Sequence, residues 1–453
     1  MNRKRLFYIL ALATGLLLTA GVVYINSLLP IITGYAAKNL CSNIFVSGRD
    51  QKSIEETDLN FSFIKLTRNE VDYDNKKVES RFLWGRSVAV YRDGFGATLL
   101  RDVTEDELLD IEFPELDPPE FIKDTVLWPL GDRLPDSVST GIDAGAMGNV
   151  TEKIMSENGY NGNAFAFMVV HKGIPVAEAY KPGFSEDTRF LSWSMAKSFV
   201  NAFAGIMAGE GLLDVNSPAG IEEWEGDERR NITINDLLQM QSGLEWNEDY
   251  GNRSDVTVML HCDDDMSRYA FDRPARYPAG TKWYYSSGTT NIVSYILRKK
   301  TGNDDAYYTF LHRNLFSRTG IRDAVFEVDP EGTMVGSSYL YLTARDYARF
   351  GLLYLNDGVF NGERILPEGW VEYSTTPASA SEGEYGAFFW LNRSGKLPSA
   401  PRDMYMCVGH DGQRIFIIPS MEMVVVVLGY SPSSNGGMDF DTLLRDILGS
   451  VKG

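Results

Sequence analysis

The segment from Leu6 to Ala37 contains no charged residue, and this limits how the start of the chain can fold. Its first part, Leu6 to Ile25, is long enough to cross a hydrocarbon core of about 30 Å at about 1.5 Å per helical residue. Cleavable signal sequences have apolar regions of only about 7–15 residues. We therefore expect an uncleaved signal anchor, with cleavage near Ala36-Ala37 as the alternative. The basic Arg3-Lys4-Arg5 stays cytoplasmic, and the remaining chain is periplasmic.

The composition excludes several classes of partner and cofactor. The 453 residues carry a net charge of −19 with no basic run beyond the N-terminus, so we expect no nucleic acid partner. The three cysteines (Cys41, Cys262, Cys407) are too few for a disulfide scaffold, although one disulfide is compatible with them. The run 261–265 (His-Cys-Asp-Asp-Asp) has no spaced second ligand set, so we interpret it as an acidic loop. We expect no metal and no cofactor.

Changes in composition predict three parts along the chain: an anchor over residues 1–37, a small domain with a linker over 38–134, and a large domain over 135–453. In the small domain, Arg81–Tyr91 predicts a strand pair or one bent strand, and Ala97–Leu100 follows a turn and pairs back. The proline-rich, acidic stretch Glu112–Pro135 is typical of a linker. On this division, a chain starting at Asn39 should remain folded and active.

The large domain is predicted to have strands at both ends and helices between them. The strands are Ala164–Val170, Ile174–Tyr180, Arg414–Ile418 and Met423–Leu428. The helices are Thr233–Met240, Thr290–Lys300, Thr343–Leu355 and Phe440–Leu448. This order predicts one antiparallel sheet, closed by N-terminal and C-terminal strands, in a mixed α/β (α+β) fold.

Ser194 and Lys197 are one helical turn apart at the start of an apolar segment rich in small residues. Positions i and i+3 share a helix face, so the amine can reach the hydroxyl. A serine is a weak nucleophile until a neighbour accepts its proton, and burial brings the pKa of a lysine towards neutrality. The helix N-terminus also favours negative charge at the serine. Ser194 is thus the candidate nucleophile, although S-x-x-K alone also fits an ordinary capped helix.

A second motif follows in the stretch 278–288, where Tyr285 precedes Ser287 at the entry to a helix. Both side chains can point into one cleft. A tyrosine beside an ammonium group is easier to ionise than one in water and could accept the Ser194 proton.

A third motif, His410-Asp411-Gly412-Gln413, enters the strand Arg414–Ile418. A glycine there allows close approach of a substrate backbone. The Gln413 N–H would then be free to form an oxyanion hole with the Ser194 N–H.

These three motifs in this order resemble those of the serine beta-lactamase and penicillin-binding protein superfamily, most of all its class C-type branch of esterases, D-aminopeptidases and 6-aminohexanoate-dimer hydrolases. The resemblance spans about Pro135 to Gly453. It implies an antiparallel sheet flanked by helices with an all-helical subdomain. It also implies that Ser194 is acylated, that Lys197 is its amine partner and that Tyr285 is the base that later protonates the leaving group.

The chain departs from the beta-lactamase pattern at two positions. Ser287 replaces the asparagine of Y-x-N, and His410 replaces the lysine of K-T-G that holds a substrate carboxylate. A mostly neutral histidine holds a carboxylate less well, so esters or amides without one are the expected small-molecule substrates. The stretch Trp246–Tyr250 faintly resembles the nylon-oligomer hydrolases. Its acidic residues either receive a substrate amine or form a solvated loop, and we expect the loop.

The sequence therefore predicts a membrane-anchored serine hydrolase of ester or amide bonds. A catalytically silent binding or cell-wall-sensing protein on the same fold is the first alternative. A zinc hydrolase is the second, and it is disfavoured because the ligand set is missing.

Overall fold

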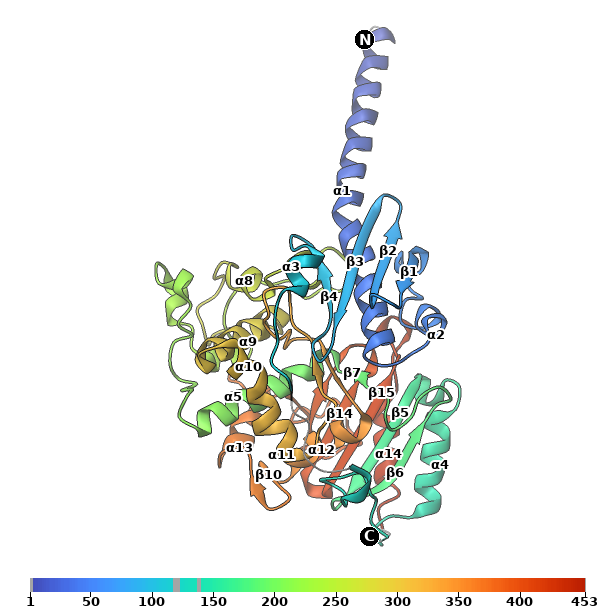
Figure 1. Cartoon of the computed structure of the whole chain (residues 1–453), viewed down its shortest axis with the longest axis vertical. Helices are drawn as coiled ribbons and strands as arrows, with labels where there is room; N and C mark the ends of the chain where they lie inside the picture. Colours follow the sequence, from blue (N-terminus) through green and yellow to red (C-terminus); the bar gives the residue numbers. More distant parts are fainter. Residues whose placement is uncertain (1–2, 117–122, 137–139, 453) are drawn as a thin grey trace.

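The computed structural model describes residues 3–116, 123–136 and 140–452. They form a large α/β domain and a small N-terminal unit from which one long helix projects (Figure 1). This confirms the predicted mixed class with an antiparallel sheet. Residues 117–122, inside the predicted linker, lie outside the described residues.

The large sheet has six strands, and every neighbouring pair is antiparallel. In spatial order they are β12 (Trp390–Leu391), β13 (Tyr405–Val408), β14 (Arg414–Ile418), β15 (Met423–Gly429), β5 (Ala164–His171) and β6 (Ile174–Tyr180). The first long strand of the domain, β5, lies beside the last, β15. The prediction that strands from the two ends of the domain close one sheet is confirmed.

Helices cover both faces of this sheet, because alternate residues of its central strands point to opposite sides. Phe167, Val425 and Val427 face α4 (Ala144–Met155) and α14 (Phe440–Leu448). Met168 and Val426 belong to the larger core on the other side, which includes α12 (Ala344–Leu355).

The remaining elements form a helical region beside the sheet (Figure 1). Its helices are α5 (Ala196–Gly209), α6 (Ile234–Leu238), α7 (Asp255–Cys262), α8 (Met266–Phe271), α9 (Ser287–Thr301), α10 (Asp304–Leu311), α11 (Ser317–Thr319) and α13 (Trp370–Thr375). Two minor sheets accompany them: β7 (Phe190–Leu191), β9 (Leu340–Leu342) and β8 (Val325–Phe326), and the hairpin β10 (Val359–Phe360) with β11 (Glu363–Arg364).

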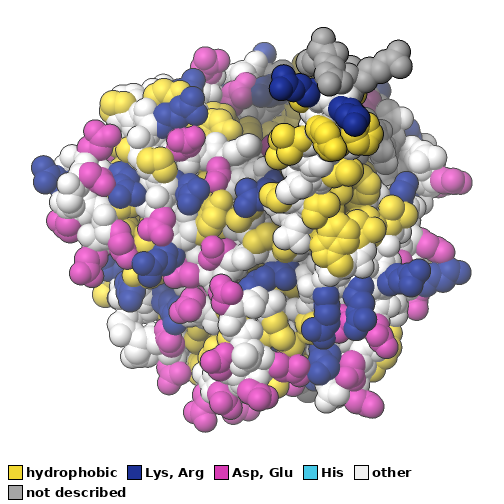
Figure 2. Space-filling view, turned by 90° about the horizontal axis from the view of Figure 1, so that it is seen from above, with side chains coloured by type: hydrophobic (Ala, Val, Ile, Leu, Met, Phe, Trp, Pro, Cys, Tyr) yellow, Lys and Arg dark blue, Asp and Glu magenta, His cyan; other side chains and the backbone are white. Residues whose placement is uncertain are grey.

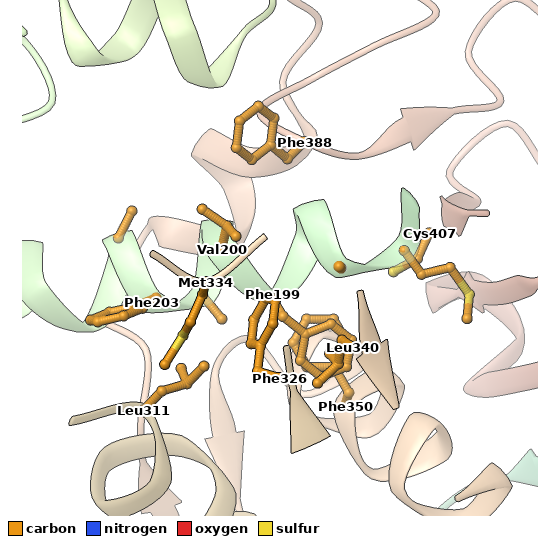
Figure 3. Close-up of a cluster of buried hydrophobic side chains, with 14 of the residues drawn as sticks. Phe199, Val200, Phe203, Leu311, Phe326, Met334, Leu340, Phe350, Phe388 and Cys407 are labelled. Carbon is orange, nitrogen blue, oxygen red and sulfur yellow. The ribbon is translucent and has the colours of Figure 1, made fainter. Parts of the chain in front are cut away.

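The helix that follows Ser194, α5, is enclosed on all sides, and every residue from Ala196 to Met207 is buried. Figure 3 shows Phe199 and Phe203 pointing into the cluster below the helix, where Phe199 stacks on Phe350 at 3.7 Å between ring centroids. Gly205 lies against the Trp370 indole, which leaves no room for a Cβ atom. Close packing of this kind immobilises the helix and the residues at its start.

The first helix, α1, runs from Arg3 to Phe45 and so continues past Ala37, where the anchor was expected to end. Its second half packs under a four-stranded antiparallel sheet: β1 (Arg68–Asp72), β2 (Lys77–Phe82), β3 (Gly85–Arg92) and β4 (Gly96–Leu100). The predicted strand pair over 81–91 is therefore the end of β2, a turn and β3. Ala36 and Ala37 are fully buried in this core, which does not fit the alternative of cleavage there.

The apolar first half of α1 projects from the molecule. Side chains such as Leu17 and Val23 are 73% and 64% exposed. The helix is long and apolar enough to cross a membrane.

A buried charged network fixes α1 to the large domain. Glu327, on the loop after β8, is fully buried and forms an ion pair with Lys38. Its Oε1 also accepts hydrogen bonds from the Ser42 hydroxyl and the Ala97 N–H, each at 2.7 Å. Since a buried carboxylate without partners is strongly destabilising, this network makes the small unit and the large domain depend on each other. The expectation for a chain starting at Asn39 overlooked this contact.

The second half of the predicted linker is also fixed rather than free. Arg349 on α12 forms an ion pair with Asp132 at 2.5 Å and donates to the carbonyls of Pro129 and Gly131. The three cysteines are free thiols, so the one disulfide that the sequence allowed is not formed.

Candidate active site

Ser194 lies in a single turn of 3-10 helix, Trp193–Met195, that leads directly into α5. The preceding Trp193 has a φ of +46°, which is unusual for a residue other than glycine. Its indole stacks on Tyr35 of α1, with 6.2 Å between ring centroids, and meets His410 edge-on at 5.6 Å. Trp193, the residue before the candidate nucleophile, is thus held by contacts with both the small unit and the third motif.

Lys197 points at Ser194, as the i, i+3 spacing predicted. Its Nζ donates to Ser194 Oγ at 2.9 Å, to Ser287 Oγ at 3.1 Å and to the Ser337 carbonyl at 2.9 Å. The side chain is 1% exposed. Burial lowers the pKa of Lys197 to about 8, although the carboxylate of Glu248 opposes the shift. A neutral amine is therefore available near neutral pH.

Tyr285 lies in the same site, but its pKa shifts in the direction opposite to the prediction. The Lys197 Nζ is 4.8 Å from the centre of its ring. Burial and the negative charge of Glu248 raise the pKa of Tyr285 above its usual value, and hydrogen bonding to Ser194 lowers it by less. This direction is opposite to the expected easy ionisation of the phenol, because burial and Glu248 outweigh the lowering effects of Ser194 and Arg414. The raised pKa favours the neutral form of the phenol.

Ser287 links the site to the carboxylate of Glu248, a residue that was expected in a solvated loop. Its hydroxyl donates to Glu248 Oε1 at 2.5 Å, and its N–H donates to Glu248 Oε2 at 2.9 Å. Trp246 Nε1 and the Tyr250 hydroxyl also donate to this carboxylate. The solvated-loop interpretation is wrong for Glu248. The glutamate lies behind the Lys197–Ser287 pair because the loop before α7 folds back over the N-terminus of α9.

His410 lies at the cleft, in the turn between β13 and β14. Its ring stacks on Tyr250 at 5.1 Å, and its Nε2 is 3.2 Å from Asp411 Oδ1. Gly412 has a φ of +94°, and a Cβ atom there would lie 3.0 Å from Ser431. A Cβ atom at Gly409 would come closer still to its neighbour, at 2.2 Å from the Ser192 carbonyl oxygen. Both glycines are needed for the turn to pass between the serine segment and the loop after β15.

The Gln413 amide is not the free donor that the sequence suggested. Its N–H donates to the His410 carbonyl at 3.4 Å, and its side chain bonds both the N–H and the carbonyl of Gly429. Gln413 is 4% exposed and is absent from the lining of the cleft. It braces the turn, because the 3-10 geometry of residues 410–412 directs its amide inwards.

The cleft in front of Ser194 has a volume of about 360 Å³. Residues from all three motifs line it, with Trp390 and the loop after β15 completing the rim. A larger hollow of about 690 Å³ lies on the outer face of the small sheet and is lined mainly by charged side chains of that sheet. It contains no candidate nucleophile, so the smaller cleft is the candidate active site.

Arg414 also lines the cleft, although it belongs to none of the three motifs. Its Nη1 donates to the carbonyls of Gly409 and Gln413, both at 2.8 Å, and its guanidinium lies over the Phe440 ring at 4.7 Å. Burial lowers its pKa to about 10, so it remains charged at neutral pH. Among the described residues, no carboxylate forms an ion pair with it. A motif search could not find this arginine, because it is the first residue of an ordinary strand.

Within residues 3–116, 123–136 and 140–452, no group of three or more His, Cys, Asp or Glu side chains is placed to hold a metal ion. The Asp264 carboxylate of the run 261–265 instead accepts the N–H groups of Asp102 and Val103.

Comparisons with known proteins identify the family. The Beta-lactamase family model matches residues 150–449. A 6-aminohexanoate-dimer hydrolase from Paenarthrobacter ureafaciens is 28% identical over 295 residues, covering 59% of this chain and 72% of the relative.

Solved structures show the same fold. A Bacillus anthracis protein assigned to the 6-aminohexanoate-dimer hydrolases superposes with a TM-score of 0.59 at 22% identity, over 75% of this chain and 93% of that one. A penicillin-binding protein homologue from Caulobacter crescentus gives 0.54 at 15% identity, over 70% and 98% of the two chains. The predicted resemblance is confirmed, and the relatives are hydrolases. The chain belongs to the serine beta-lactamase family.

Proposed function

We propose that the protein is a membrane-anchored, extracytoplasmic hydrolase that cleaves ester or amide bonds through an acyl-enzyme on Ser194. The observation that carries the proposal is the buried Lys197 amine, which contacts the Ser194 hydroxyl at 2.9 Å and has a pKa of about 8. A buried lysine that is partly neutral and touches a serine at a cleft provides an activated nucleophile.

The contacts support the following sequence of proton transfers. Neutral Lys197 takes the proton of Ser194 while Oγ attacks the substrate carbonyl. When the bond to the leaving group breaks, the Tyr285 hydroxyl protonates that group, because a phenol with a raised pKa is a donor rather than a base. Lys197 then returns its proton to Tyr285. Water attacks the acyl-enzyme by the same steps in reverse and releases the acid.

Labelling with a fluorophosphonate tests this proposal. We expect one adduct, at Ser194, formed at a rate that rises with pH around a midpoint near 8, because the Lys197 ammonium must lose its proton first. The Glu248 carboxylate raises the pKa of Lys197, so Glu248→Gln should move the midpoint to lower pH. Intact-mass spectrometry over a pH series measures both effects.

Asp249→Asn is the matched control, since Asp249 is the exposed neighbour of Glu248 and should leave the midpoint unchanged. Absence of an adduct on folded protein would favour the catalytically silent alternative. An unchanged midpoint in Glu248→Gln would show that another group controls the reaction.

Arg414 refines the expected substrate. His410 alone suggested a cleft that disfavours carboxylates, but the unpaired Arg414 guanidinium gives the cleft a permanent positive charge. We expect Arg414→Gln to lower kcat/KM for an ester with a terminal carboxylate by about 10–100-fold, the effect of one charged hydrogen bond. A neutral p-nitrophenyl ester of equal length should be nearly unaffected, and it controls for damage to the turn that Arg414 braces. Equal losses for both esters would assign Arg414 a structural role only.

The membrane anchor rests on the first half of α1. Its described apolar side chains are largely exposed, and a bilayer would cover them. The basic residues at its start favour a cytoplasmic N-terminus, and this supports our proposal of a cleft outside the cytoplasm.

A further inference from the structure

The end of the small sheet nearest to the projecting half of α1 exposes large apolar side chains. Leu83 and Trp84, in the turn between β2 and β3, are 64% and 58% exposed, and Phe63 and Leu66 are both 55% exposed. Trp84 Nε1 donates to Asn26 Oδ1 at 3.1 Å, so this turn lies beside the end of the apolar run of α1. Seen from that end, hydrophobic side chains form a patch with Lys and Arg side chains beside it (Figure 2).

Three arginines form a row across the same end of the sheet. Arg68, Arg81 and Arg86 are directly opposite one another in β1, β2 and β3, and all three are exposed. Glu79 is the one carboxylate of the described residues that pairs with Arg81 and Arg86. Like charges opposite one another on neighbouring strands destabilise a sheet. An anionic surface in front of the row would relieve this repulsion.

We propose that this end of the sheet, the interfacial tip, lies in the headgroup region of a bilayer that contains anionic phospholipid. The tip comprises the four apolar residues above and the arginine row. The proposal rests on the membrane anchor in the proposed function. Tryptophan side chains favour the level of the headgroups, and arginines bind anionic lipid there. Trp84 lies at that level, because its partner Asn26 directly follows the apolar run that would cross the hydrocarbon core.

The tip would give the protein a second membrane contact and fix its orientation. The Lys38–Glu327 ion pair links the large domain to α1. Tyr35, which touches Trp193 beside Ser194, lies ten residues after Ile25 on α1, or about 15 Å further along the helix axis. The cleft would then be held at a constant, short distance from the membrane surface.

An environment-sensitive dye on the full-length protein tests the tip directly. Leu83→Cys places the dye at the tip, and Leu212→Cys places it at a partly exposed leucine of the large domain as the control. Cys262→Ser removes the one native cysteine that is not buried. The protein is reconstituted in phosphatidylcholine vesicles with brominated acyl chains, with or without phosphatidylglycerol. We expect bromine to quench the dye at position 83 and not at position 212, and more strongly with phosphatidylglycerol.

Replacing Arg81 and Arg86 together by glutamine should remove most of the effect of phosphatidylglycerol, because each arginine at an anionic surface changes the docking equilibrium constant about fivefold. Protein that floats with the vesicles but shows no quenching at position 83 would contradict the proposed interfacial tip and leave the proposed membrane anchor intact. Protein that does not float with the vesicles would overturn both. Quenching that is equal with and without phosphatidylglycerol would overturn the role of the arginine row. Labelling of Ser194 is measured separately, so none of these outcomes is confused with a failure of the hydrolase proposal.

Discussion

Ser194→Ala is expected to lower turnover by about 10⁶-fold while leaving the fold intact, because only the group that accepts the acyl chain is lost. The Lys197 amine keeps its contacts with Ser287 and the Ser337 carbonyl in this variant, so the buried site should retain its packing. Hydrolysis of a p-nitrophenyl ester and the thermal unfolding temperature are the two measurements.

Lys197→Ala should cause a similarly deep loss, and the double variant Ser194→Ala/Lys197→Ala should be little worse than either single one. Residues that act as a unit show this strong non-additivity. Ser185→Ala, on an exposed loop, is the matched control and should retain full activity. If the folded Ser194→Ala protein kept most of its activity, the assignment of the nucleophile would be wrong.

Shortening the N-terminus should have opposite outcomes at two nearby positions. A chain that starts at Asn26 lacks the exposed apolar half of α1 but keeps Leu29, Tyr35 and Lys38, so we expect it to be soluble, folded and active. A chain that starts at Asn39 loses Lys38 and leaves the fully buried Glu327 without its cation. Removing one partner of a buried ion pair costs about 3–5 kcal/mol. The chain that starts at Asn39 also lacks the Tyr35 ring, which packs on Trp193.

Thermal unfolding and ester hydrolysis of the two shortened chains measure this difference. Lys38→Met in the full-length protein isolates the ion pair, since it keeps the apolar stem of the side chain and removes the charge. We expect this variant to be destabilised by a comparable amount and to remain anchored. Equal stability and activity of the Asn26 and Asn39 chains would mean that α1 is only a tether.

The large domain could be predicted from the sequence because its elements have strong local signals. The apolar strands β5, β14 and β15 are bounded by turn residues, and α14 was predicted at its observed limits, Phe440–Leu448. Ser194 and Lys197 meet because their spacing on one helix determines it. The position of Tyr285 could be expected only from the order of the three motifs, since nothing local brings residue 285 to residue 194.

Tertiary structure decided the electrostatics of the site and the role of the N-terminal segment. Burial raised the pKa of Tyr285 and lowered that of Lys197, which is why our proposal has the lysine accept the Ser194 proton. Glu248 and Arg414 have ordinary sequence surroundings and reach the site only because a loop and a strand fold around it. Lys38 ends an uncharged run and looks like the boundary of an anchor. Glu327, 289 residues away, makes it part of the core. Local patterns determine which elements form, whereas desolvation and pairing depend on which distant residues those elements bring into contact.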